Sequence, residues 1–288
     1  MQTINANRFE VPPKCEYTAS MPTASDPSPA GRREMIEVAG RKTEVLRGGD
    51  GPPLLYLHSA AGEMDWSELH RQLARRHEVI AAAHPGFSYS DGLATIRDIT
   101  DYAWHTVDLL DSLGLSDPLP LVGFSLGAWI AAETAILRPG RVSHLVLTCA
   151  AGLRLADAPY GDLFQDDLDR LRELLFHPGT PDDIVEQAMP LSMQDNRIVQ
   201  WLKAREATAR VGWNPYLHNP RLRAHLHRIA APTLVLWADG DRLIPPAHAD
   251  AWAEAIPGAS KQIIAGAGHM LPFEQPAAWA DAVTAFLD

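Results

Sequence analysis

Cysteine is scarce in this sequence: Cys15 and Cys149 are the only two in 288 residues. They do not form a CxxC pair, which excludes a disulfide framework and a cysteine-rich metal site, and we interpret both as unreactive thiols. An excess of positive charge is missing as well, since the formal net charge is −11. Nucleic acids and anionic membrane surfaces bind clusters of Lys and Arg, so this balance argues against both as partners and favours a small molecule.

Long apolar runs are also missing. No stretch reaches the roughly 18 apolar residues that a transmembrane helix needs. The first residues, MQTINANRFEVPPK, lack the basic and apolar segments of a secretory signal, so we expect a cytoplasmic protein. The motifs HExxH, GxxxxGK and GxGxxG do not occur, and no metal or organic cofactor is expected. His225 and His227 lie in a basic helical stretch and are expected to face solvent rather than bind a metal.

Strand and helix patterns alternate along most of the chain. Residues 1–33 are rich in Pro, Ser, Thr and Ala and are expected to form a flexible leader without a core of its own. From Met35 onward, apolar runs alternate with helical periodicity, which predicts an α/β fold with a mostly parallel central sheet flanked by helices. Residues 153–229 show helical patterns only, so a core of residues 34–152 and 230–288 is expected to carry an inserted helical cap. Ligands of such sheets bind beyond the carboxyl ends of the strands.

The segment LPLVGFSLGAWIAAE places Ser125 between Gly123 and Gly127, where a buried strand gives way to a helix. A sharp turn there strains the backbone at the serine and brings the strand and the helix close together at the two glycines. The turn lifts the hydroxyl clear of the sheet, and the amide of Leu126 at the helix N-terminus then favours a developing oxyanion. The alternative is an ordinary glycine turn, since GxSxG also occurs by chance. The strand-to-helix context favours a nucleophile.

A serine nucleophile requires a base, and the base requires a group that orients it. His269 follows the last predicted strand in the loop GAGHMLPFEQP, and we predict that it is the general base. Asp239 and Asp241 both follow the predicted strand TLVLWA and are the candidates for the orienting carboxylate. The chain order is therefore Ser, Asp, His.

Five segments, taken together and in this order, resemble the α/β-hydrolase fold superfamily, specifically its cap-bearing members: LLYLHSAAG, HPGFSYSDG, VGFSLGAWIAAE, LWADGDRLIPP and GAGHMLPFEQP. The resemblance covers roughly residues 35–288. It implies the α/β-hydrolase fold, with Ser125 as the nucleophile and His269 as the base. The triad acid of the family lies in a DRxxP segment, which selects Asp241 and leaves Asp239 as a turn former before Gly240.

The family also supplies an oxyanion donor from the loop after the third strand, usually in a His-Gly-X pattern. The pattern here is His58-Ser59-Ala60, so the resemblance implies that the amides of Ala60 and Leu126 form the oxyanion hole and that His58 is a structural loop residue. Ser59 replaces the usual glycine. Either its hydroxyl donates a further hydrogen bond to the oxyanion or it is a tolerated small residue, and we favour the second interpretation.

The implied chemistry is acyl transfer by a serine hydrolase that cleaves a small-molecule carboxylic ester or lactone through an acyl-enzyme. Relatives that cleave carbon–carbon bonds in ring-cleavage products, which are activated ketones, commonly have a tryptophan after the catalytic histidine and a glycine-rich oxyanion loop. Met270 and Ser59 stand at those places, which favours an ester or lactone. A haloalkane dehalogenase would have a carboxylate in place of Ser125. Perhydrolase-like activity and a receptor without turnover remain alternatives, and the oligomeric state is open, a homo-oligomer included.

The substrate pocket is expected beneath the cap. Its candidate residues are Ser59, Phe124, Trp213 and Met270. Three further apolar residues of the cap are candidates, although core packing within the cap explains them equally well: Trp201, Tyr216 and Met193.

Overall fold

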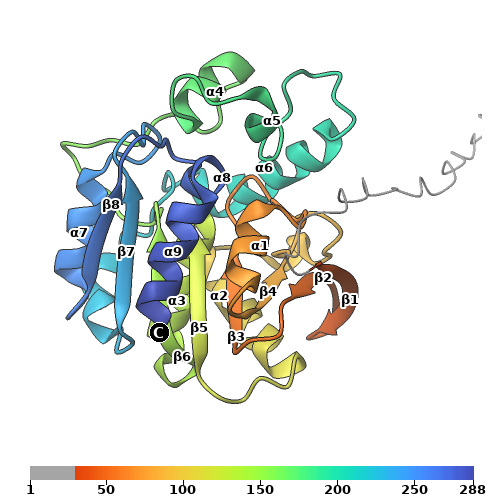
Figure 1. Ribbon diagram of the computed structural model, residues 1–288, viewed down its shortest axis with the longest axis vertical. Coiled ribbons are helices and arrows are strands. Elements are labelled where there is room, and N and C mark those ends of the chain that lie inside the picture. Colours follow the sequence, from red (N-terminus) through yellow and green to blue (C-terminus); the bar gives the residue numbers. More distant parts are fainter. Residues whose placement is uncertain (1–29) are drawn as a thin grey trace, which may run out of the picture.

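An eight-stranded sheet in the order β1-β2-β4-β3-β5-β6-β7-β8 runs through the computed structural model, which describes residues 30–288 (Figure 1). The strands are β1 (Arg32–Val38), β2 (Arg41–Gly48), β3 (Pro53–Leu57), β4 (Glu78–Ala82), β5 (Leu119–Phe124), β6 (Val142–Thr148), β7 (Thr233–Ala238) and β8 (Ser260–Ile264). β2 pairs antiparallel with β1 and β4, and all other neighbours are parallel. The predicted α/β fold with a mostly parallel sheet is confirmed.

The N-terminal end of the sheet begins earlier than the sequence pattern predicts. Most of the expected leader, residues 1–29 together with Cys15, lies outside the described residues. Its last residues do not: β1 begins at Arg32. Arg33 forms an ion pair with the buried Glu44 of β2 and donates to the carbonyl of Met64 at 2.7 Å. The boundary shifts because polar contacts, which apolar periodicity does not register, hold this strand end.

Helices flank the sheet, as the alternating pattern predicts. α1 (Glu68–Ala74) packs against α9 (Pro276–Leu287), and α2 (Ile99–Ser112) packs against α3 (Leu126–Leu137). α7 (Ala247–Ala255) contacts β7 and β8, and the short α8 (Leu271–Glu274) precedes α9. In residues 30–288, no helix combines the length and the apolar composition that crossing a bilayer requires.

Four tryptophans fill the core between these layers: Trp129, Trp237, Trp252 and Trp279. Each indole N–H donates to an acceptor within the protein, as buried indoles usually do. The Trp279 indole, for example, donates to the hydroxyl of Thr148 at 3.0 Å, which joins α9 to the end of β6. The core therefore fixes the helices against the carboxyl ends of the central strands.

A helical segment connects β6 to β7 and lies above the carboxyl ends of the strands (Figure 1). It comprises α4 (Leu168–Leu175), α5 (Asp182–Val185), α6 (Ile198–Gly212) and the 3-10 helix η3 (Leu222–Arg228). α4 begins after the N-cap Asp167, whose side chain accepts from the amides of Asp169 and Arg170, and it ends before Pro178 and Gly179, neither of which continues a helix well. His225 and His227 in η3 are exposed. The segment occupies the expected place of the cap, and its independence as a domain stays a prediction.

Several histidines are buried in the core near the carboxyl ends of β3 and β4. His58, His70, His84 and His105 are each no more than 2% exposed. Burial lowers the pKa of His70 to about 3 and that of His105 to about 4, and it also lowers the pKa of His58 and His84. Both ring nitrogens of His105 have no hydrogen-bond partner in the described part of the chain. These rings therefore resist taking up a proton in the folded state.

This burial predicts a stability that falls in mild acid. An unfolded histidine binds a proton below a pH of about 6.5, whereas the folded rings stay neutral until the pH approaches their lowered pKa values. The rings of His70 and His105 are each expected to reduce the free energy of unfolding by about 1.4 kcal/mol per pH unit as the pH falls from about 6.5 towards 4. Urea unfolding between pH 7.5 and pH 4.5 measures this slope. His105→Leu should make the slope shallower, and the exposed control His227→Gln should not; equal slopes for wild type and His105→Leu would contradict the account.

Candidate active site

Three polar side chains meet at the carboxyl ends of β5, β7 and β8. The Nε2 atom of His269 lies 3.0 Å from the Oγ atom of Ser125, and its Nδ1 atom lies 2.8 Å from the Oδ2 atom of Asp241. All three residues are at most 5% exposed. The imidazole thus contacts a hydroxyl on one side and a carboxylate on the other, which is the geometry for removing a proton from the hydroxyl.

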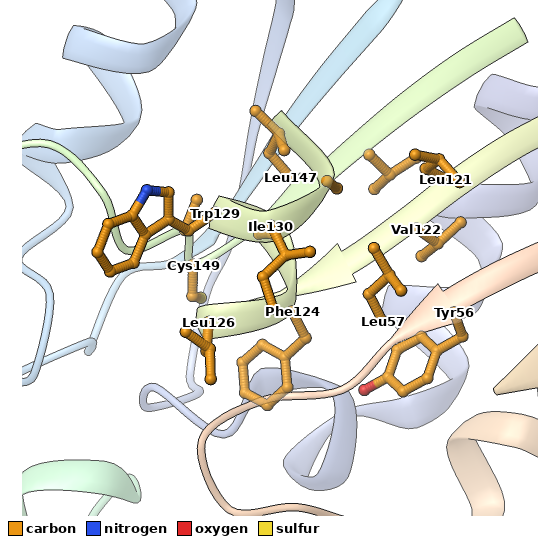
Figure 2. Packing of buried hydrophobic residues seen from close by; sticks show 14 of the residues in the cluster. Tyr56, Leu57, Leu121, Val122, Phe124, Leu126, Trp129, Ile130, Leu147 and Cys149 are labelled. Atoms are coloured by element: carbon orange, nitrogen blue, oxygen red, sulfur yellow. The ribbon is translucent and has the colours of Figure 1, made fainter. Parts of the chain in front are cut away.

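Ser125 occupies a strained turn between β5 and α3. Its φ of 53° and ψ of −110° lie in a region that L-residues rarely adopt. The turn brings α3 against the sheet so closely that a Cβ atom on Gly127 would lie 1.9 Å from the carbonyl oxygen of Leu57, and one on Gly123 would lie 2.5 Å from the Cα atom of Ala128. Figure 2 shows the apolar side chains around this turn, with Phe124 and Leu126 on either side of it. The two glycines are therefore required by close packing.

The two aspartates after β7 have different surroundings. Asp241 is 4% exposed, and its Oδ1 atom accepts a hydrogen bond from the amide of Ile244 at 2.8 Å. That bond orients the carboxylate and leaves Oδ2 for His269. Asp239 is exposed and accepts from the amide of Gly266 at 2.8 Å, so it joins the loops after β7 and β8. Asp239 makes no contact with His269 among the described hydrogen bonds and ion pairs.

A buried thiol adjoins the imidazole and its carboxylate. Atoms of Cys149, Asp241 and His269 lie within 4.8 Å of one another, and within residues 30–288 this is the group close enough to share a metal ion. The nitrogen and the carboxylate oxygen are already hydrogen-bonded to each other, and burial raises the pKa of the Cys149 thiol, which opposes the thiolate form that metals bind. The donor set therefore suits a metal poorly, and the prediction of a cofactor-free site is kept.

The loop after β3 brings one free amide to the site. Ala60 lines the same pocket as Ser125, and its N–H donates to no acceptor among the described residues. The N–H of Leu126 begins α3, ahead of the helix's own hydrogen bonds, so it too lacks an intrahelical partner. The side chain of Ser59 does not join them. Its hydroxyl donates to the Oε2 atom of Glu63 at 2.8 Å, which argues against the alternative in which Ser59 donates to the oxyanion.

A pocket opens beside Ser125 and His269, beneath the helical segment. Most of its remaining wall is apolar and comes from that segment and from the loops after β7 and β8: Leu163, Phe164, Leu171, Leu175, Ala188, Trp201, Leu243 and Met270. Ser59, Thr208 and Arg205 add polar groups to the wall. The guanidinium of Arg205 lies 4.5 Å from the centre of the Trp201 ring and donates to the carbonyls of Leu163 and Gln165. Arg205 was not predicted as a pocket residue, because a charged residue type does not indicate that the side chain lines an apolar pocket.

Four of the predicted pocket residues lie elsewhere. Phe124 is fully buried and packs its ring 5.5 Å from that of His269, behind the site rather than in the pocket. Trp213 is 64% exposed and covers Phe164 from outside, with ring centres 5.2 Å apart, and Met193 is also exposed. The hydroxyl of Tyr216 donates to the carbonyl of Gly161. These candidates are not in the pocket wall, because apolar residue type alone does not say whether a side chain faces a pocket, the core or solvent.

The loop that carries His269 is fixed by the helical segment above it. The amide of Met270 donates to the carbonyl of Leu175 at the end of α4, at 3.0 Å. Glu274 accepts from the amide of Gly268 at 2.7 Å with one oxygen, and from the amide of His177 at 2.7 Å with the other. Glu274 lies in the segment GAGHMLPFEQP, and nothing in that sequence indicates this role. It joins the residue before the imidazole to the loop after α4.

Comparison with known proteins agrees with this architecture. The family model described as the alpha/beta hydrolase fold matches residues 52–276. Polyketide synthase ThaQ of Burkholderia thailandensis is 32% identical over 91% of this chain, although the chain spans only 13% of that protein's length. A Pseudomonas putida protein, 2-hydroxy-6-oxononadienedioate/2-hydroxy-6-oxononatrienedioate hydrolase 2, is 26% identical over 82% of this chain and 84% of its own length.

A solved structure gives the same picture of the fold. The crystal structure of a serine hydrolase involved in carbazole degradation, the CarC enzyme, superposes with a TM-score of 0.74 at 21% identity, covering 90% of this chain and 99% of that one. At this identity the likeness shows the fold alone. The family match, which covers most of the chain, goes further and supports a hydrolase of the α/β class. The chain belongs to the α/β-hydrolase fold family.

Proposed function

We propose that this protein is a serine hydrolase that cleaves a small-molecule carboxylic ester or lactone through an acyl-enzyme. The observation that carries the proposal is the position of His269, which lies within hydrogen-bond distance of both Ser125 and Asp241. In the proposed reaction His269 takes the hydroxyl proton as Ser125 attacks the carbonyl carbon, and it then donates that proton to the leaving oxygen. Water activated by the same imidazole releases the acyl group.

The amides of Ala60 and Leu126 are proposed to bind the oxyanion of the tetrahedral intermediate. The Leu126 amide follows the nucleophile in the chain, and Ala60 lies in the wall of the pocket that contains Ser125. Neither N–H group has an acceptor among the described residues. Preformed donors of this kind stabilise charge only as it develops, and loss of one donor costs about 3 kcal/mol of the barrier reduction in other hydrolases. Strain at Ser125 supports the same role, because it holds the hydroxyl and the Leu126 amide in one fixed relation.

The pocket supports a substrate with an apolar portion. Its wall is mostly aliphatic and aromatic, as the walls of small-molecule sites usually are. We propose that the apolar acyl or alcohol group lies against the α4 and α6 side of the pocket. A cytoplasmic location and the absence of a cofactor stay predictions from the sequence.

Carbon–carbon bond hydrolysis is the second candidate. The Pseudomonas putida relative is named as a hydrolase of 2-hydroxy-6-oxononadienedioate and 2-hydroxy-6-oxononatrienedioate, and such unsaturated ketones are the kind of substrate that carbon–carbon bond hydrolases cleave. Met270 follows His269 here, and its buried side chain lines the pocket at the place where the family's ring-cleavage hydrolases commonly have a tryptophan. This difference favours the ester. A receptor without turnover is the third candidate and is separated from both by the experiment below.

The proposed function predicts ester turnover and covalent capture at one residue. Purified protein is expected to hydrolyse p-nitrophenyl butyrate, and an alkyl p-nitrophenyl phosphonate is expected to inactivate it while adding one phosphonyl group to the Ser125 peptide in the mass spectrum. Ser125→Ala should show neither reaction. Turnover of a ring-cleavage product but not of esters would favour the second candidate. Wild type that shows no turnover and no adduct would contradict the hydrolase proposal.

The two aspartates after β7 provide a matched pair of variants. Asp241→Asn is expected to lower kcat by about 10⁴-fold, because an asparagine at this place favours the wrong tautomer of His269. Asp239→Asn removes an exposed carboxylate that contacts Gly266 rather than His269, so its kcat should stay within about threefold of wild type. Steady-state kinetics on the same ester, with thermal unfolding of both variants, makes the comparison. Equal losses for the two variants would contradict the assignment of Asp241.

A further inference from the structure

Glu63 is a buried acid at the end of the loop that carries the Ala60 amide. It is 6% exposed, and it lies four residues after Ser59. Its Oε1 atom accepts from the Ser59 amide at 2.8 Å and from the Tyr56 hydroxyl at 3.2 Å, and its Oε2 atom accepts from the Ser59 hydroxyl at 2.8 Å. Burial and the nearby carboxylate raise the pKa of Tyr56, which keeps its phenol a donor. A carboxylate is buried at low cost only when such donors surround it.

Ser59 completes the network on the other side. Its Oγ atom accepts from the amide of Ala61 at 3.1 Å, and its carbonyl accepts from the amide of Gly62 at 3.1 Å. The amides of Ser59, Ala61 and Gly62 therefore each have an acceptor inside the loop, while the amide of Ala60 between them has none. Because Ala60 also lines the pocket, the loop satisfies its own donors and leaves one for a ligand.

The network also explains the serine at the usual glycine position. Ser59 is not among the described residues with positive φ, so the backbone there does not require glycine. A glycine would keep the main-chain bond from residue 59 to Glu63 but would lose the hydroxyl's two bonds, one to Glu63 and one from Ala61. The hydrogen bond between the Ser59 hydroxyl and the Glu63 carboxylate therefore needs both residues, and it is lost when either one is replaced.

We infer that Glu63 is a positioning residue for the oxyanion hole: through Ser59 it fixes the loop so that the Ala60 amide points at the developing charge. This inference rests on the proposed function. It adds to the nucleophile, base and acid a fourth residue that affects the reaction by fixing the position of the Ala60 amide. A shift of about 1 Å in a catalytic group lowers rates by about 100-fold, so a loop that loses its anchor should lose much of the contribution of that amide. Substrate binding, which depends mainly on the apolar wall, should change little.

The test compares Glu63→Ala, Glu63→Gln and Ser59→Ala with wild type on p-nitrophenyl butyrate and on the phosphonate. Glu63→Ala is expected to lower kcat and the phosphonylation rate by the same factor, about 10- to 100-fold, with KM within about twofold. Glu63→Gln keeps the shape and one acceptor and should lose less. Ser59→Ala should add no further loss in the Glu63→Ala background, because both substitutions break the same network.

A matched control separates positioning from general destabilisation. Glu133 in α3 is also buried, at 7% exposure, and accepts from the indole of Trp129 and the side-chain amide of Asn219, and no described hydrogen bond joins it to the loop. Glu133→Gln should keep kcat within about twofold of wild type even where its melting temperature falls as far as that of Glu63→Gln. If wild type is active and folded Glu63→Ala matches it in kcat, or if Glu133→Gln loses as much kcat as Glu63→Ala, the inference is overturned. A wild type with neither turnover nor adduct instead overturns the proposed function, and this inference with it.

Discussion

The close approach of α3 to the sheet is the constraint on which the rest of the site depends. Gly127 lies so near the main chain of Leu57 that no side chain fits, and Ser125 accepts a strained backbone as a consequence. The same packing brings the start of α3 beside the loop after β3, so the free amide of Leu126, next to Ser125 in the chain, and the free amide of Ala60, in the pocket wall, lie on either side of this contact. The strain is sustained by a densely packed core around the turn (Figure 2). The proposed chemistry is therefore a property of the packing as much as of the reactive side chains.

The helical segment above the sheet does more than cover the pocket. α4 ends against the loop that carries His269. The carbonyl of Leu175 accepts a hydrogen bond from Met270, and Glu274 accepts from His177 after α4 and from Gly268 before the imidazole. A movement of α4 would strain the bonds that place the imidazole. The pocket wall and the position of the base are thus set by the same contacts, which couples the shape of the substrate site to the geometry of proton transfer.

Sequence patterns predicted the parts of this architecture that depend on periodicity and on short segments. The parallel strands, the flanking helices and the turn at Ser125 all follow from apolar spacing and from two glycines, and His269 follows from its place after a strand. The place after β7 gave Asp239 and Asp241 alike, and the family resemblance selected Asp241. The lining of the pocket followed only in part. Ser59, Trp201 and Met270 lie in the wall as expected, but Trp213 faces solvent and the unexpected Arg205 lies in the wall, because the orientation of a cap helix depends on packing with distant loops. Glu63 was missed for a related reason, since nothing in HSAAGEM indicates that the acid folds back onto Ser59.

The central claim is that the amides of Ala60 and Leu126 form one oxyanion site beside Ser125. A crystal structure of the phosphonate-treated protein tests it most directly, because the phosphoryl oxygen stands where the oxyanion of the ester reaction would lie. The account predicts phosphorus bonded to the Oγ atom of Ser125 and its free oxygen within about 2.7–3.1 Å of both amide nitrogens. An adduct whose oxygen points to solvent, or bonds to other donors while the Ala60 amide turns away, would contradict it.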